Sequence, residues 1–450
     1  MDSNTKLGTK ALDANTTGTN NTAIGFHALH LNRDANDNTA CGSHALHNNE
    51  SGEANTATGA NALKLNSTGR FNVACGTSAL QFNTLGSDNT AVGVEALSLN
   101  SRGESNTAVG AEALFSNGSG AWNTAVGARA LYSNSTDQIP SPPYVFDGSG
   151  NTAIGHEALF ANVTGHGNVA VGVNALRSNT SASNCTAAGQ GALISNTSGQ
   201  SNSAFGVGTL ESNTTGEANT AMGRLAMVHV VKGGYNTAIG AHSGPFPDSE
   251  SSTFVGSGAT SSTHVTNSTA VGSSAQVTAD NQVRFGNSSV TSIGGRVSYS
   301  TFSDARYKRN ISENVPGLEF VNRLRPITYQ LDVEALARKR QALRPALKED
   351  ATLAAPSRIV YTGFVAQEVE RAAKESRFVF SGVDPAKNDE DLYGLRYAEF
   401  VVPLVRSVQE LHVECEKLRN EVELLKGRSS GSPMRPGDDV TTNNVGARPY

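Results

Sequence analysis

The sequence predicts a mainly β protein, in which a repetitive parallel β-roll or solenoid forms a fibre and a small α+β domain ending in a coiled coil follows it. Two observations support this fold class. A block that begins with Asn and ends with Gly recurs every 17 residues, and the composition changes near residue 300. Residues 1–300 contain 30 charged side chains and 38 of the 46 glycines, whereas residues 301–450 contain 45 charged side chains. One uniform globular domain would not change composition so abruptly.

The repeat occupies residues 1–250. The block NTAIG at 21–25 recurs as NTAVG at 89, 106 and 123, and after one longer gap it resumes from 151 to 236, which gives 14 units. A unit of 17 residues is too short for a helical repeat, which needs about 30 residues or more, so the period indicates a solenoid. Residues 251–302 carry degenerate repeats at a shorter spacing and are expected to end the fibre.

Each coil is expected to contain two short strands, the N-T-A-x and the A-L segments, joined by turns at Gly and Asn. Alternation along the first strand places Thr and the following Val or Ile on one face and Ala on the other. We expect a core of Ala, Val, Ile and Leu, with coils stacked at roughly 4.8 Å. Because so short a coil encloses little volume, several chains are expected to pack together. The four cysteines are expected to be small apolar fillers.

One longer gap interrupts the repeat. Removing the 11 residues Asp137–Asp147 restores the regular spacing, so this segment is an insertion. It is interpreted either as a tolerated surface loop or as a finger that contacts a receptor through Tyr144 and Phe146.

Histidines recur at equivalent positions of two neighbouring coils. His27 corresponds to His44 and His30 to His47, so stacking should bring each pair together. A solvated polar ladder is favoured over a metal site for these pairs, and no metal or other cofactor is predicted.

The C-terminal third is expected to hold a domain over residues 303–400. Its segment 315–332 predicts a helix that runs into a strand after Pro326, and segment 363–372 predicts the start of another helix. The polar segment 334–358 is interpreted as an inserted helix or loop.

A heptad pattern over residues 401–426 predicts a coiled coil, and the polar residues 427–450 predict a disordered tail. The two seam positions are occupied by Val401, Val408, Cys415 and Val422, and by Leu404, Leu411, Leu418 and Leu425.

Charge and hydropathy exclude several classes of partner. The net charge is -5 and neither part is strongly basic, which argues against nucleic acid. No stretch of 18 apolar residues exists, so no membrane span is expected. The N-terminal residues lack the apolar core of a signal peptide, so the chain is expected to fold in the cytoplasm of the producing cell.

Four blocks occur in a fixed order: SDARYKRNI from Ser303, RPITY from Arg325, GFVAQEV from Gly363, and YAEFVVPLVRSVQEL from Tyr397. Together, over roughly residues 303–426, they resemble the intramolecular chaperone auto-processing domain of endosialidase-type tailspikes and phage tail fibres. The repeats themselves resemble the heads of trimeric adhesins and fibre repeats of phage tail proteins. These resemblances imply a homotrimer.

The resemblance also implies that the C-terminal domain guides folding and then cuts the chain between Phe302 and Ser303. Ser303 would be the nucleophile and Lys308 the base. A free lysine has a pKa near ~10.4 and must be desolvated or crowded by cations before it can act as a base. Arg306 and Arg309 are close in sequence and are accessory candidates for this reason, and Asp304 is a further accessory candidate.

The spacing of the pair constrains its geometry. Two residues five positions apart do not share a face of one regular helix or strand, so either a turn intervenes or another subunit contributes.

The favoured interpretation is a trimeric receptor-binding or surface-attachment fibre that matures by a single self-cleavage and carries no turnover enzyme. It would act on a virion, an injection particle or a cell exterior, with a cell-surface receptor or glycan as partner and attachment to a baseplate or particle. The alternative is a trimeric autotransporter-like adhesin head or another structural surface fibre without catalysis.

Overall fold

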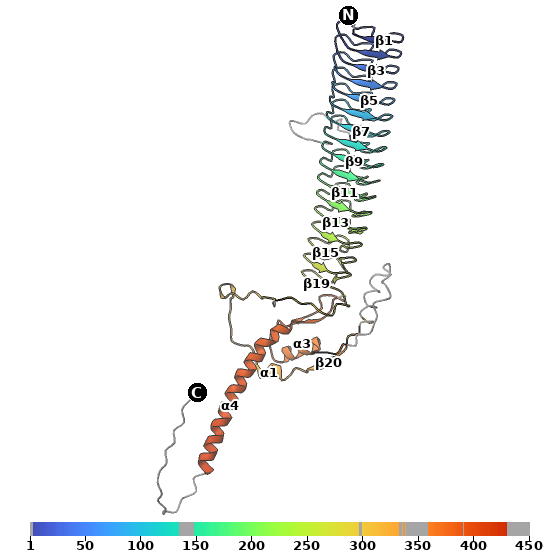
Figure 1. The fold of residues 1–450 in the computed structure, drawn as a ribbon. Helices are drawn as coiled ribbons and strands as arrows, with labels where there is room; N and C mark the ends of the chain where they lie inside the picture. Colours follow the sequence, from blue (N-terminus) through green and yellow to red (C-terminus); the bar gives the residue numbers. More distant parts are fainter. Residues whose placement is uncertain are drawn as a thin grey trace, which may run out of the picture. The chain divides into compact units, whose positions relative to one another are not determined.

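The computed structural model describes residues 3–134, 148–296, 299–332, 335, 338, 359–389 and 391–429. The chain divides into two units, Met1–Ile293 and Gly294–Tyr450 (Figure 1). The first is a parallel β-solenoid and the second contains short sheets and helices. Tyr144 and Phe146, most of the insertion 334–358, and residues 430–450 of the expected tail lie outside the described residues.

The solenoid is built on one sheet of 17 parallel strands, to which each coil contributes a single strand of three residues. Equivalent residues pair between neighbouring coils, for example Thr90 with Thr107 and Val92 with Val109. The strands are β1 (Thr5–Leu7), β2 (Thr22–Ile24), β3 (Thr39–Cys41), β4 (Thr56–Thr58), β5 (Val73–Cys75), β6 (Thr90–Val92), β7 (Thr107–Val109), β8 (Thr124–Val126), β9 (Thr152–Ile154), β10 (Val169–Val171), β11 (Thr186–Ala188), β12 (Ser203–Phe205), β13 (Thr220–Met222), β14 (Thr237–Ile239), β15 (Thr253–Val255), β17 (Thr269–Val271) and β19 (Val283–Phe285).

The predicted second strand is wrong for the regular coils. There the A-L segment is a turn, because its leucine adopts a left-handed backbone, as Leu97 does with φ 51°. This conformation bends the chain and ends any extended run. Among the described residues, β16 (Thr260–Ser261) and β18 (Gln276–Val277), in the later coils of shorter spacing, pair as a second parallel sheet.

The core is narrower than the sequence suggested. A regular coil buries the alanine at the centre of its strand and the following Ala-Leu pair, as Ala91, Ala96 and Leu97 show with no exposed surface. The prediction that Val and Ile point inward is wrong, since Val92 is 38 % exposed. Alternation puts the residues on both sides of a buried alanine outward. Each chain therefore buries its own Ala and Leu side chains without a partner.

Two columns of fully buried asparagines complete the interior. In one column the side-chain amide bonds the amide of the preceding coil, as Nδ2 of Asn100 donates to Oδ1 of Asn83 at 2.8 Å. In the other column the backbone N–H donates to the preceding side chain, as Asn106 does to Oδ1 of Asn89 at 3.0 Å. These ladders satisfy polar groups that would be costly to bury alone.

The glycine that ends each block is required by the stacking. At Gly93, with φ 138°, an added Cβ would lie 2.4 Å from the carbonyl oxygen of Gly110 in the next coil. Any side chain at this position would push neighbouring coils apart.

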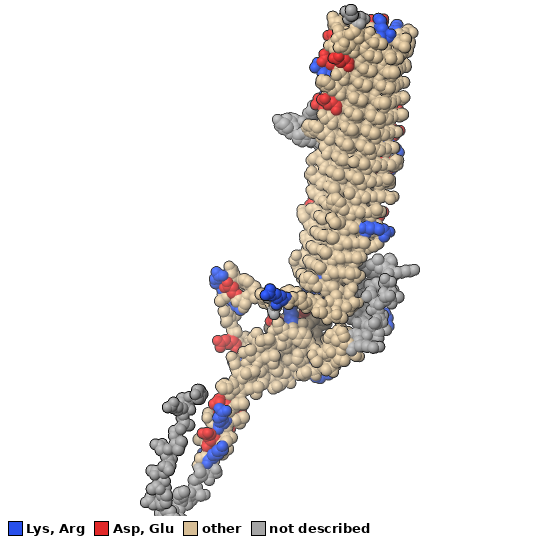
Figure 2. Space-filling model, viewed as in Figure 1, with Lys and Arg blue, Asp and Glu red and all other residues tan. Residues whose placement is uncertain are grey.

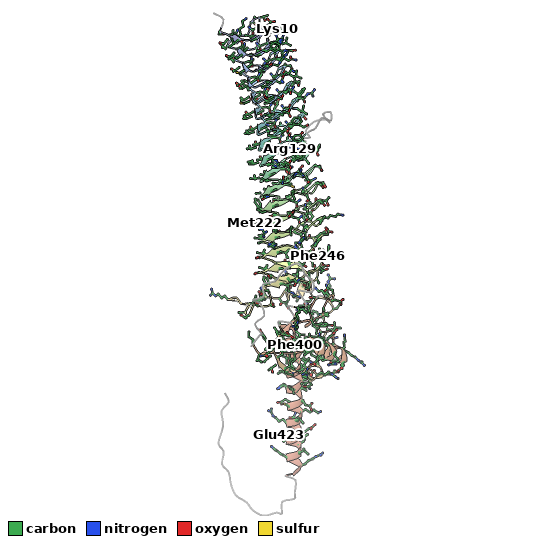
Figure 3. The ribbon with its side chains drawn as sticks, turned by 90° about the vertical axis from the view of Figure 1, so that its right-hand side faces the viewer. Lys10, Arg129, Met222, Phe246, Phe400 and Glu423 are labelled. Atoms are coloured by element: carbon green, nitrogen blue, oxygen red, sulfur yellow. The ribbon has the colours of Figure 1, made fainter. Side chains whose placement is uncertain are left out.

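The residue after the buried alanine forms an outer apolar column along the sheet. Figure 3 labels one member, Met222, on the solenoid, and one face of the solenoid carries few charged side chains (Figure 2). The exposed apolar members of this column include Ile24, Val92, Val109, Val126, Ile154, Val171, Phe205, Met222 and Ile239.

The second unit confirms the predicted order of its elements. Helix α1 (Leu318–Val321) is followed by β20 (Ile327–Tyr329), which pairs antiparallel with β21 (Tyr361–Gly363), and helix α3 (Ala366–Glu375) comes next. The other elements are the 3-10 turn η1 (Ala305–Tyr307), β22 (Val383–Asp384), β23 (Gly394–Leu395), the 3-10 turn η3 (Tyr397–Phe400) and α4 (Val401–Ser429).

An aromatic core holds this unit together. Phe320 of α1 and Val369 of α3 are buried with Phe400, which Figure 3 labels. The ring of Phe320 lies 5.0 Å from that of Phe380 and 5.3 Å from that of Phe378. Edge-on and tilted contacts of this kind are favourable beyond the burial of area alone.

Helix α4 covers the whole predicted heptad segment, and its seam is exposed in the single chain. Leu404, Leu411 and Leu418 are each about half exposed. Val401, Leu404, Val405, Val408 and Gln409 line an apolar groove with a volume of about 310 Å³.

Candidate functional site

A tight turn brings the two predicted catalytic side chains together. Nζ of Lys308 donates a hydrogen bond to Oγ of Ser303 at 2.8 Å. Between them the chain forms the single 3-10 turn η1, which Lys308 ends with its N–H bonded to the carbonyl of Ala305. Of the two geometries that the spacing left open, the turn is the one observed.

The turn is held by Asp304 and Arg306. Asp304 caps η1 by accepting the backbone N–H of Arg306 at 2.9 Å, and the same carboxylate contacts the guanidinium at 2.6 Å. The side-chain hydrogen bond from Arg306 lowers the pKa of the Asp304 carboxyl, and Asp304 in turn raises the pKa of Arg306. The two accessory candidates therefore form an ion pair that shapes the turn.

The third accessory candidate, Arg309, forms no hydrogen bond or ion pair with other residues in the described part of the chain. Sequence reasoning missed an aromatic contact beside the Phe302–Ser303 bond, since the rings of Phe302 and Tyr307 lie 5.5 Å apart. The sequence signal for it is one aromatic residue directly before Ser303 and another directly before Lys308.

The site is open to solvent in the single chain. Ser303 and Lys308 are exposed, and Phe302 and Tyr307 are 75 % and 69 % exposed. The distance suits transfer of a proton from the serine hydroxyl to a neutral lysine amine. The desolvation that such a lysine needs is not supplied by the residues around it here.

A second polar contact links α1 to α4. Oε2 of Glu410 accepts the N–H of Leu318 at 2.8 Å, and its other oxygen accepts from Arg406 at 3.1 Å. An added Cβ at Gly317 would lie 2.5 Å from this carboxylate. The contact fixes one side of α4 against the domain and leaves the heptad seam free. No sequence spacing could have indicated it, because the partners are 92 residues apart.

Among the described helices, none is both long and apolar enough to cross a membrane.

Comparison with known proteins agrees with this arrangement. No curated protein shows significant similarity to the chain. A family of peptidases described as chaperone of endosialidase matches residues 303–376, a segment that begins at Ser303 and includes Lys308. The segment that follows the parallel β-solenoid thus carries the features of a chaperone of endosialidase domain.

Proposed function

We propose that this chain is a trimeric, tail-fibre-like structural protein whose C-terminal domain aligns three chains and then cuts itself off between Phe302 and Ser303. The observation that carries the proposal is the 2.8 Å contact between Nζ of Lys308 and Oγ of Ser303. The contact lies at the start of the segment that matches the chaperone family. The mature fibre would stand on a virion, an injection particle or a cell exterior and bind a surface receptor or glycan.

The cleavage step is an acyl transfer followed by hydrolysis. Neutral Lys308 accepts the hydroxyl proton while Oγ of Ser303 attacks the carbonyl carbon of Phe302. The bond to the nitrogen of Ser303 breaks, that nitrogen receives the proton, and an ester joins Phe302 to Oγ. Water then hydrolyses the ester, leaving a carboxylate on Phe302 and restoring the hydroxyl. The products sum to the full chain plus one water.

The exposure of the site connects cleavage to assembly. The pair already has bonding geometry in one chain, but it lies in solvent. A neighbouring chain that covered Phe302 and Tyr307 would exclude water and favour the neutral amine. Cleavage would then occur only after the chains have assembled.

The exposed seam of α4 supports association of several chains. Leucines at one seam position and β-branched residues at most of the other form an apolar stripe that a single helix leaves in water. Burying that stripe between copies would align the chains at a defined register.

Intact mass spectrometry of the purified full chain tests the proposal. We expect two species, Met1–Phe302 and Ser303–Tyr450, after incubation at neutral pH. Ser303→Ala and Lys308→Ala should each leave one full-length species that is still trimeric by sedimentation. Ser300→Ala is the matched control, since this exposed serine precedes the motif and should cleave normally. Normal cleavage by Lys308→Ala would refute the assigned base.

A further inference from the structure

Four histidines gather on two adjacent coils of the solenoid. His27 and His30 belong to one coil, and His44 and His47 to the next. The rings of His27 and His30 lie 4.6 Å apart, and those of His30 and His47 lie 5.2 Å apart. His27 also stacks on His44 at 5.4 Å. Lys10, of the preceding coil, is labelled near the N-terminal end of the solenoid in Figure 3.

Three of these residues have the arrangement of metal ligands. One ring nitrogen from each of His27, His30 and His47 lies within 4.8 Å of the other two. Zinc–imidazole bonds of about 2.0–2.1 Å require nitrogens about 3.3 Å apart in a tetrahedral site. Small rotations of the three half-buried histidine side chains would bring their nitrogens to this separation. Because the ligands come from two coils, a bound ion would join those coils.

Hydrogen bonds to the opposite ring nitrogens favour this role. Nδ1 of His30 lies 3.3 Å from the carbonyl oxygen of Lys10, which can only accept, so Nδ1 carries the proton and Nε2 keeps its lone pair. Nδ1 of His47 contacts Oδ1 of Asn48 in the same way. Protein metal sites commonly orient their histidines through such a bond from the second nitrogen.

His27 adds an independent observation. Its Nδ1 is buried and has no hydrogen-bond partner among the described residues. A buried polar atom without a partner is costly, and a bond from this nitrogen to a metal ion would offset that cost.

The donor atoms and the charges around the cluster restrict which kind of cation it can bind. Lys10 and Lys64 lie near His27 and His44 respectively, and both oppose a cation. Asp13 stands at the position of the preceding coil equivalent to His30. With imidazole as the main donor, hard cations such as calcium and magnesium are unsuited, whereas zinc, copper and nickel are suited.

We propose that His27, His30 and His47 bind one divalent transition-metal ion, with Zn²⁺ as the reference ion, and that this ion clamps two neighbouring coils of the solenoid. The inference is independent of cleavage and of the α4 seam.

A calorimetric titration of the full chain with Zn²⁺ alone tests the site. We expect one high-affinity ion per chain. His27→Asn and His30→Gln should each weaken binding at least tenfold. Both variants keep the coil, because Asn61 and Gln81 occupy the same two positions in other coils, and Asn61 has φ 58° there. His242→Asn is the matched control, since His242 holds the position of His27 without a histidine three residues later.

Two further readouts separate this site from other zinc ligands. X-ray absorption should show nitrogen and oxygen neighbours near ~2.0 Å and no sulfur near ~2.3 Å, which excludes the exposed Cys41 and Cys75. Zinc at 100 times its dissociation constant should slow hydrogen exchange in residues 22–47 about 100-fold. Absence of zinc binding, sulfur ligation, or equal affinity in His27→Asn would overturn the proposal.

Discussion

One asparagine column contains a natural defect that yields a quantitative prediction. Cys185 occupies a position that is asparagine in the neighbouring coils. Its thiol still donates to the carbonyl oxygen of Gly199 at 3.2 Å, and its N–H donates to Oδ1 of Asn168 at 2.9 Å. Burial raises the pKa of the thiol, which keeps this donor protonated. The change therefore removes one function of asparagine, the amide oxygen that accepts from the next coil.

In place of the amide oxygen, the backbone N–H of the fully buried Asn202 bonds the sulfur of Cys185, which is a weak acceptor. In a regular coil Oδ1 of Asn89 accepts both the N–H and Nδ2 of Asn106, at 3.0 and 3.1 Å. Nδ2 of Asn106 keeps a second acceptor, the carbonyl oxygen of Gly120. Asn89→Cys should therefore leave one buried N–H with only a weak sulfur acceptor, as Cys185 does.

A buried donor left wholly without a partner costs about 1–3 kcal/mol, and this sets the upper limit for replacing the amide oxygen by sulfur. Asn89→Cys should lower local stability by up to this amount, and Cys185→Asn should raise it by a similar amount. Cysteine and asparagine are similar in size, so a cavity contributes little. Native-state hydrogen exchange at Asn106 and Asn202 measures the effect directly. We expect up to about 150-fold faster exchange at Asn106 in the first variant and correspondingly slower exchange at Asn202 in the second.

The two variants control each other, since they make the same exchange in opposite directions at equivalent positions. If Cys185→Asn leaves exchange at Asn202 unchanged, the amide oxygen is not what the column requires, and the reasoning fails.

Three further predictions concern other parts of the chain. Gly93→Ala should disrupt stacking with Gly110 and lower the thermal midpoint of the solenoid, whereas a wild-type midpoint would contradict the close approach of the coils. Arg306 lowers the pKa of Asp304. The ion pair therefore contributes to the stability of the folded turn above the ordinary carboxyl pKa of about 3.9, and this contribution is lost as the pH falls through the lowered pKa of Asp304. Carbon NMR of the Asp304 carboxyl checks this, and Arg306→Gln should restore an ordinary titration. Leu411→Lys, in the exposed seam, should reduce trimer formation in sedimentation experiments without unfolding the domain, and unchanged assembly would exclude this seam.

The repeat, the alternation and the position of α4 were predictable because they depend on periodicity, which the sequence displays directly. The backbone conformation of the A-L segment was not, because a leucine with φ 51°, such as Leu97, has no sequence signal that distinguishes it from a strand leucine. Hydropathy also misplaced Val92, since an apolar residue next to a buried alanine looks like core even when alternation turns it outward.

Asparagine was interpreted only as a turn residue, although it also fills the interior. The sequence shows its recurrence, but the burial of both columns depends on amides bonding between coils, which appears only once the coils are stacked. At the candidate site the spacing of Ser303 and Lys308 limited the geometry to two alternatives, and the cap by Asp304 explains why the turn forms. The contact of Glu410 with α1 required the fold itself.

A fibre of this kind would need a folding domain to set the register between chains, and not to complete a core. The solenoid buries its Ala, Leu and Asn side chains within one chain, so a lack of core does not by itself require three chains. What several chains would share is the outer apolar column, which repeats with every coil. A partner shifted by one coil meets nearly the same surface and loses only the contacts at the ends. Many registers of similar free energy would therefore compete. The heptad of α4 lies outside the repeat and can select one register before the solenoids associate.

Expression of residues 1–302 alone should therefore give misassembled fibres, while fibres cleaved after assembly keep their register because sliding would break many contacts at once. A protease-resistant trimer formed by residues 1–302 alone would show that the solenoid selects its own register.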